Sequence, residues 1–168
     1  GCIHGGSGSI IDCQNFGSLT VNNSHADSCY GGLSGFHTQT QRIIGSTNTG
    51  DVIVNVSLTG TATGVGGMIG GRGNVKVTDG QIAGNKIKCT VRAVDAGHGV
   101  GMLVGHFNGA SEMHIGTEDS PIEVGGTLKI GDTETVIDAT NFDSLDLLCG
   151  GCKNFNDTKH LFTTVLAQ

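Results

Sequence analysis

Cys149 and Cys152 are separated by two glycines, which is the spacing of a redox-active or metal-binding cysteine pair. A redox pair lies at the start of a helix, and glycine is a poor helix former, so the intervening Gly150 and Gly151 fit that role badly. A zinc site needs further ligands, and the nearest along the chain is His160. The other cysteines are distant in sequence: Cys2, Cys13, Cys29 and Cys89. We interpret the pair as unpaired thiols near the end of the domain; a disulfide to one of them and a metal or redox site are the alternatives.

The histidines are the next candidates for metal binding or acid-base chemistry. His37 follows Gly35 by two residues, whereas His106 follows Gly105 by one. If both lie in strands, this difference of one residue points their side chains to opposite faces, so no ladder of stacked histidines is expected. We assign no metal site and interpret the histidines as exposed turn residues: His4, His25, His37, His98, His106, His114 and His160.

Acidic residues would serve a polysaccharide-cleaving enzyme if they were clustered. They are dispersed along the chain instead: Asp51, Asp79, Asp95, Glu112 and Glu118. The basic residues Lys86, Lys88 and Arg92 lie near an expected strand, and the remaining Lys and Arg residues are scattered singly. We therefore assign no catalytic and no cofactor-binding residue, and we keep a carbohydrate-active enzyme, a lyase or hydrolase, as the alternative function.

A glycine-rich run that recurs three times indicates how these side chains are positioned. Residues 30–35, 65–70 and 100–105 carry it, each 35 residues after the one before. A fixed period with glycines and apolar residues in register is typical of repeat architectures. The repeated positions are Gly31, Gly32, Leu33 and Gly35, then Gly66, Gly67, Met68 and Gly70, then Gly101, Leu103 and Gly105.

Alternating apolar residues predict a strand after each glycine run. Val52, Val54, Val56 and Leu58 occupy every second position, which is typical of a half-buried strand. A shift of 35 places Ile87, Cys89, Val91 and Ala93 on these positions, so that Cys89 replaces a valine as a buried, unreactive thiol. With the glycine run itself and residues 36–44, each unit holds three strands. The sequence therefore predicts an all-β parallel β-helix with coils of about 35 residues, in which Leu33, Met68 and Leu103 form one internal ladder; a β-sandwich is the alternative fold.

The repeat divides the chain into three parts. We expect an N-terminal cap and degenerate unit at 1–28, solenoid units at 29–63, 64–98 and 99–133, and a C-terminal cap at 134–168. The same shift of 35 places Leu19 and Val21 on Val54 and Val56, and places Ile122 and Val124 on Ile87 and Cys89. The glycine run is missing after the third unit, and residues 147–151 are its displaced copy.

Composition and charge limit the possible functions. The chain has 168 residues, 30 glycines, one proline and a formal net charge of -6, with nine Lys and Arg. The glycines lack the three-residue period of collagen. Without a basic patch or stripe, nucleic-acid binding is not expected. No apolar stretch is long enough for a membrane-spanning helix, so membrane insertion is not expected either. The first residues lack the charged and apolar regions of a signal peptide, so we interpret the chain as trimmed or mature and leave open that an export signal was removed.

The run Gly32-Leu33-Ser34-Gly35 resembles the Gly-Leu-any-Gly signature of the GLUG motif. Gly67-Met68-Ile69-Gly70 is similar, and Met102-Leu103-Val104-Gly105 departs at its first glycine. The resemblance covers residues 29–105. It implies a β-solenoid of a bacterial cell-surface or secreted protein, adhesin-like and non-enzymatic, that binds an unidentified surface protein or glycan or acts as a stalk. It also implies an extracellular or cell-surface location, and a segment of a longer surface protein is a further possibility.

Overall fold

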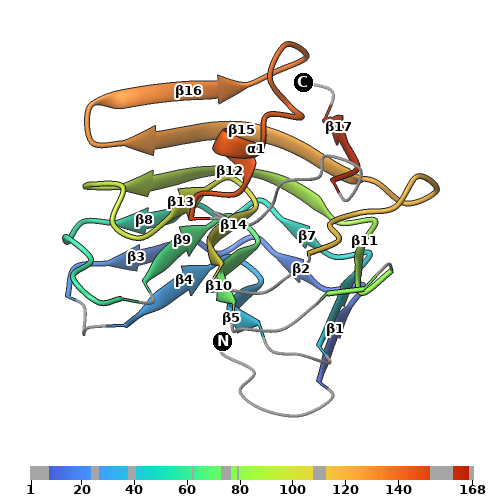
Figure 1. Ribbon diagram of the computed structural model, residues 1–168, viewed down its shortest axis with the longest axis horizontal. Helices are drawn as coiled ribbons and strands as arrows, with labels where there is room; N and C mark the ends of the chain where they lie inside the picture. The colour runs from blue at the N-terminus through green and yellow to red at the C-terminus, as the bar shows by residue number, and fades with distance from the viewer. Residues whose placement is uncertain are drawn as a thin grey trace.

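The computed structural model describes residues 8–23, 27–37, 41–61, 63–72, 77–78, 80–107, 113–151 and 161–166. These residues form a parallel β-helix of about four turns, which confirms the fold class predicted from the repeat (Figure 1). Several residues singled out above lie outside the described part: Cys2, His4, His25, Asp79, Glu112, Cys152 and His160.

Strands from successive coils lie above one another. The first coil holds β1 (Ser9–Ile11), β2 (Gln14–Asn15), β3 (Leu19–Val21), β4 (Cys29–Gly31) and β5 (Ser34–His37). The second holds β6 (Arg42–Ile44), β7 (Thr47–Asn48), β8 (Val52–Val54), β9 (Gly64–Gly66) and β10 (Ile69–Arg72). The third holds β11 (Ile82–Ala83), β12 (Lys86–Ala93), β13 (Val100–Gly101) and β14 (Val104–Phe107). The fourth opens with β15 (Ile122–Ile130) and continues through β16 (Thr133–Ile137) and the short helix α1 (Leu145–Leu148); β17 (Thr163–Val165) follows.

Four sheets run up the stack, one more than the three strands expected in each unit. Sheet A has the order β1-β6-β11, sheet C the order β13-β9-β4 and sheet D the order β14-β10-β5. Sheet B contains β2, β3, β7, β8, β12, β15, β16 and β17. The count differs because the glycine run is not a single strand: the corner at Gly32 and Leu33 divides it into β4 and β5.

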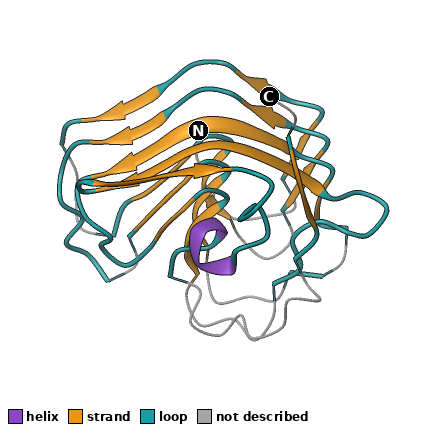
Figure 2. Cartoon of the chain, turned by 90° about the horizontal axis from the view of Figure 1, so that it is seen from above, coloured by secondary structure: helices purple, strands orange, loops and turns teal. Residues whose placement is uncertain are grey.

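The stack ends on a hairpin and a short helix. β16 pairs antiparallel with the second half of β15, and β17 pairs parallel with its first residues. Together they cover the outer edge of the last long strand, which an open sheet would leave unpaired. Figures 1 and 2 show α1 over the middle of the coil on this same side. The amide of Leu103 donates to the carbonyl of Leu148 (2.9 Å) and Val104 bridges to Cys149, so residues 147–151 are indeed the displaced copy of the run.

Sheet B does not keep the 35-residue spacing expected of it. Leu19 lies beside Val52, not Val54, and Val91 lies beside Val52, not Val56. Ile87 pairs with Asn48 and Val124 pairs with Ile87, so the equivalences assigned to Val52, Cys89 and Ile122 were also wrong. The spacing between neighbouring coils is 33, then 39, then 37 residues in this sheet. Each value differs from 35 by an even number. A shift by an even number of residues keeps the same side chains on the buried face, so the alternation of apolar and polar residues does not reveal the shift.

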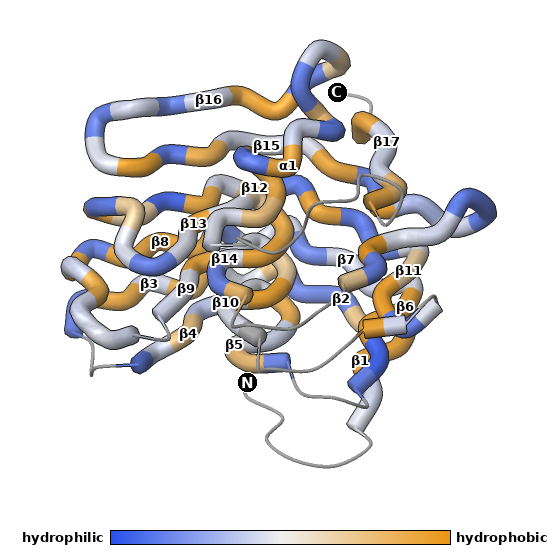
Figure 3. Tube along the Cα trace, viewed as in Figure 1, coloured by the Kyte–Doolittle hydropathy of each residue, from blue (hydrophilic) through white to orange (hydrophobic). Residues whose placement is uncertain are grey.

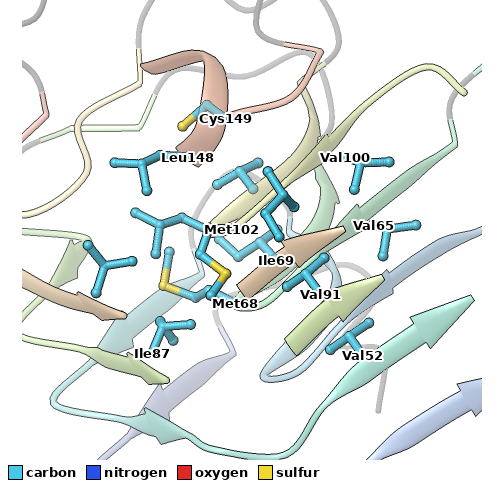
Figure 4. Close-up of a cluster of buried hydrophobic side chains, with 14 of the residues drawn as sticks. Val52, Val65, Met68, Ile69, Ile87, Val91, Val100, Met102, Leu148 and Cys149 are labelled. Carbon is cyan, nitrogen blue, oxygen red and sulfur yellow. The ribbon is translucent and has the colours of Figure 1, made fainter. Parts of the chain in front are cut away.

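Buried hydrophobic residues from successive coils form one continuous core inside the β-helix. Met68, Ile87 and Met102 are fully buried in it (Figure 4). Hydrophobic and hydrophilic residues alternate along β12 and β15, as expected for strands with one face on the core and one in solvent (Figure 3). Of the expected inward set, Val52, Val54 and Leu58 are buried, whereas Val56 is half-buried because β8 ends at Val54.

Candidate functional site

The repeated glycines form a seam in which sheets C and D contact each other through their backbones. Gly31, Gly66 and Gly101 are stacked in sheet C. A Cβ atom at Gly66 would lie 2.8 Å from the amide nitrogen of Gly105, and one at Gly101 would lie 2.6 Å from that of Gly150. Cβ atoms are not found this close to backbone atoms, so no larger residue fits either position without moving a strand.

The glycines of sheet D meet sheet C in the same way. A Cβ atom at Gly70 would lie 2.3 Å from the nitrogen of Tyr30, and one at Gly105 would lie 2.2 Å from that of Val65. Each strand of sheet D therefore packs against the sheet C strand of the preceding coil, and the two columns of glycines interlock. The alignment of Gly31, Gly66 and Gly101 and that of Gly70 and Gly105 share one physical cause, which is this close approach. Gly35, in the first coil, has no preceding strand to meet, and a Cβ there would lie 3.1 Å from the carbonyl oxygen of Cys29.

The apolar positions of the repeat form the internal ladder that the sequence predicted. The amide of Leu33 donates to the carbonyl of Met68 (3.1 Å), and the amide of Met68 donates to that of Leu103 (3.1 Å). Gly32 and Gly67 precede them at the corner, where a Cβ at Gly67 would lie 2.4 Å from the carbonyl oxygen of Met102.

Met102 replaces the corner glycine in the third coil, and its side chain points into the core. A Cβ atom at Gly126 would lie 2.8 Å from the Met102 methyl carbon, so this glycine leaves the space that the side chain occupies. Gly126 has φ +103°, a conformation that favours glycine.

A pair of stacked asparagines at an inner corner was not found from the sequence. Asn15 donates to the side-chain oxygen of Asn48 (2.7 Å), and Asn48 donates to the carbonyl oxygens of Gly50 (3.0 Å) and Gly67 (2.9 Å). Asn48 is fully buried, and these bonds satisfy backbone groups at a turn. The two asparagines are 33 residues apart, so a search at a spacing of 35 misses them.

The cysteines divide by burial. Cys89 is a buried free thiol in β12, and Cys13 is an exposed free thiol. Burial raises the pKa of Cys89 to about 12, with a further contribution from the nearby carboxylate of Asp51. The prediction of a buried thiol at Cys89 is confirmed. Cys149 is buried as well, and α1 ends directly before it, so it does not lie at a helix N-terminus.

Two histidines predicted as exposed turn residues lie in strands instead. His37 ends β5, where it is fully buried, and His106 lies in β14. His37 aligns with Phe107 and His106 aligns with Phe36, so the expected shift of one residue between them is confirmed. The ring of His106 is perpendicular to that of His98 at 6.1 Å, and its Nδ1 lies 3.1 Å from the His98 carbonyl oxygen.

Acidic side chains in the described part of the chain accept hydrogen bonds from nearby backbone and side-chain groups. Asp51 accepts a hydrogen bond from the amide of Thr90 (2.7 Å), and Asp95 accepts one from the hydroxyl of Ser57. Among the residues described here, no group of three or more His, Cys, Asp or Glu side chains could hold a metal ion.

Basic residues gather on the outward face of sheet B, contrary to the expectation that the chain has no basic patch. This face consists of the outward residues of β7, β12 and β15, which include Thr47, Lys86, Lys88, Thr90, Arg92 and Lys129. Lys86 pairs with Glu123 (2.8 Å) and Lys129 contacts Glu134 (3.5 Å). The alternation of charged and apolar residues over 86–93 indicates that the basic residues of this strand share one face. Only the pairing of β12 with β15 shows that Lys129 lies beside Arg92.

The chain matches no protein-family model, no curated protein and no solved structure. In the described ranges, none of the helices has the length and apolar character needed to cross a membrane.

Proposed function

We propose that the chain is a non-enzymatic β-solenoid of a bacterial cell-surface or secreted protein, and that it binds a glycan or protein through the outward face of sheet B. The resemblance of the glycine run to the GLUG motif supports the cellular setting. The binding role is supported by the surface itself, which presents side chains at regular spacing across the two long parallel strands β12 and β15 and the short strand β7 beside them.

The observation that carries the proposal is the regular outward face. Lys86, Thr90 and Arg92 point outward from β12, and β15 aligns with β12 over eight consecutive pairs. Neighbouring strands are about 4.8 Å apart, and outward side chains recur about every 6.6 Å along a strand. A flat array of this kind can contact an extended ligand at many points without rearranging.

Retention of ligands on beads coated with the chain tests this proposal. We expect the beads to retain at least one member of a panel of soluble glycans and proteins. Thr49→Trp, which adds a bulky side chain at an exposed position of this sheet, should reduce retention at least severalfold. Thr78→Trp makes the same change at an exposed threonine before β11, outside sheet B, and should leave retention unchanged. Equal retention by both variants would contradict a role for the face.

The alternative function is tested with the same protein. If the chain is a carbohydrate-active enzyme, incubation with polysaccharides should produce new reducing ends in proportion to time and protein concentration. Such products would overturn the non-enzymatic proposal. We expect none.

A further inference from the structure

We propose that the ligand of the sheet B face is an acidic polysaccharide, a linear glycan with carboxylate or sulfate groups along its length. This inference rests on the binding role proposed above and specifies the chemical class of its ligand. Three features of the face support it: two cations without ion-pair partners, the spacing and small residues between them, and an exposed aromatic ring.

Lys88 and Arg92 have charges available for a ligand. Both are exposed on β12, and within the described part of the chain neither has an ion-pair partner, whereas Lys86 and Lys129 are paired with carboxylates. The chain as a whole has a net charge of -6. These two cations, which no carboxylate of the described residues neutralises, are complementary to an anionic partner even though the protein as a whole is acidic.

The surface between the two cations carries threonine hydroxyl groups, with the carboxylate of Asp51 held beside it by the amide of Thr90 (2.7 Å). Lys88 and Arg92 are four residues apart along β12, or roughly 13 Å, which is longer than one sugar unit. Thr90 lies between them and Thr127 lies beside Thr90 on β15. Gly125 lies beside Lys88 and adds no side chain to the surface. A sugar chain can therefore lie along β12 with its hydroxyl groups near the threonines and its anionic groups near the two cations.

Phe16 extends this surface to the first coil. Asn15, Asn48 and Ile87 are aligned on neighbouring strands. The residues that directly follow them, which are Phe16, Thr49 and Lys88, therefore fall in one column. The Phe16 side chain is 68% exposed. It is two strands, or roughly 10 Å, from Lys88. Aromatic rings pack against the apolar faces of sugar rings, and Phe16 offers such a ring at the end of this column.

A nucleic acid is a less suitable ligand because its phosphates are closely spaced and need a continuous basic track. The carboxylates of Asp51, Glu123 and Glu134 interrupt the face and would repel such a backbone. A polysaccharide with more widely spaced charges can place its neutral hydroxyl groups at these points.

Native affinity electrophoresis tests the proposal. The wild-type protein and the variants Arg92→Gln, Lys88→Gln and the double variant are run in gels that contain polygalacturonate, chondroitin sulfate, dextran or single-stranded DNA. Arg42→Gln is the matched control for each single variant, because Arg42 is an exposed strand residue of sheet A and its substitution changes the net charge by the same one unit. This control separates altered mobility from altered binding.

We expect polygalacturonate or chondroitin sulfate to retard the wild-type protein and dextran not to do so. The double variant should bind roughly tenfold more weakly, Arg42→Gln should bind like the wild type, and added salt should weaken the interaction. The first two gels also separate carboxylate from sulfate recognition. Retardation by neither acidic glycan, or stronger retardation by DNA, would overturn the inference. If the coated beads retain a neutral glycan or protein and the double variant retains it equally, the binding role stands and the acidic class is wrong.

Discussion

The glycine seam and sheet B are built from the same coils, but the number of residues between equivalent positions is constant in the seam and varies in sheet B. In the seam, Tyr30, Val65 and Val100 follow one another at 35 residues without exception. In sheet B the spacing is 33, 39 and 37 residues over the same stack. The number of residues that connect sheet B to sheet C changes accordingly, with seven between Val21 and Cys29, nine between Val54 and Gly64 and six between Ala93 and Val100. The comparison indicates that backbone contact fixes register, whereas side-chain packing fixes only which face is buried.

This difference also separates the two roles of the molecule. The seam has almost no side chains between its sheets, so it can accept few substitutions and offers nothing to a ligand. Sheet B places its core residues on one face and leaves the other face free to vary. We therefore expect stability to be most sensitive in the seam and ligand specificity to depend on sheet B.

The most severe test of the comparison is a single added methyl group in the seam. Gly105→Ala would place a Cβ 2.2 Å from the nitrogen of Val65 and 2.5 Å from the carbonyl oxygen of Gly70. Because backbone atoms must separate to admit it, we expect a loss of about 4 kcal/mol or more in the free energy of unfolding, or failure to fold. Gly17→Ala is the control, since its nearest neighbour is 3.7 Å away and we expect a change within about 0.5 kcal/mol. Chemical denaturation measures both, and similar losses would contradict the seam.

A smaller effect is expected at the asparagine pair. Asn48→Ala removes the donor to the Gly67 carbonyl oxygen and leaves that buried acceptor unpaired, so we expect a loss of about 1–3 kcal/mol. Asn55→Ala removes a similar contact between Asn55 and Asn22 (2.9 Å), but there both residues are exposed. Its effect on the free energy of unfolding should stay within about 0.5 kcal/mol. Equal losses in denaturation experiments would show that the buried pair has no special role.

At neutral pH the smallest effect concerns the buried thiol of sheet B, whose contribution changes only under alkaline conditions. The folded-state pKa of Cys89 is raised from 9.0 to about 12, so its neutral form contributes stability that is complete below pH 9 and is lost as the pH rises toward 12. We expect the free energy of unfolding to fall more steeply over this range in the wild type than in Cys89→Ala. In the native protein at pH 8, a thiol reagent should modify Cys13 and leave Cys89 intact until unfolding. Modification of Cys89 as fast as Cys13 would show that it is accessible.

The sequence predicts the solenoid and the seam residues because both depend on a repeat whose glycines cannot move out of register. Leu33, Met68 and Leu103 were aligned correctly for this reason. The equivalences in sheet B failed because its alternation has a period of two, and a shift by two or four residues preserves it. The basic cluster was missed because Lys129 reaches Arg92 through a pairing at a spacing of 37 residues, and the asparagines were missed because theirs is 33.

Contacts between α-protons and amide protons across the seam test the central claim most directly. With glycine selectively labelled with ¹³C and ¹⁵N, nuclear Overhauser spectra should show strong cross-peaks from the α-protons of Gly66 to the amide of Gly105. The same should hold from Gly31 to Gly70, which also joins sheet C to the sheet D strand of the next coil, and from Gly101 to Gly150, which follows the bridge between Val104 and Cys149. If cross-peaks connect only neighbours within sheet C, such as Gly66 and Gly101, and none cross to sheet D, the two sheets are not in backbone contact and the account of the repeat is wrong.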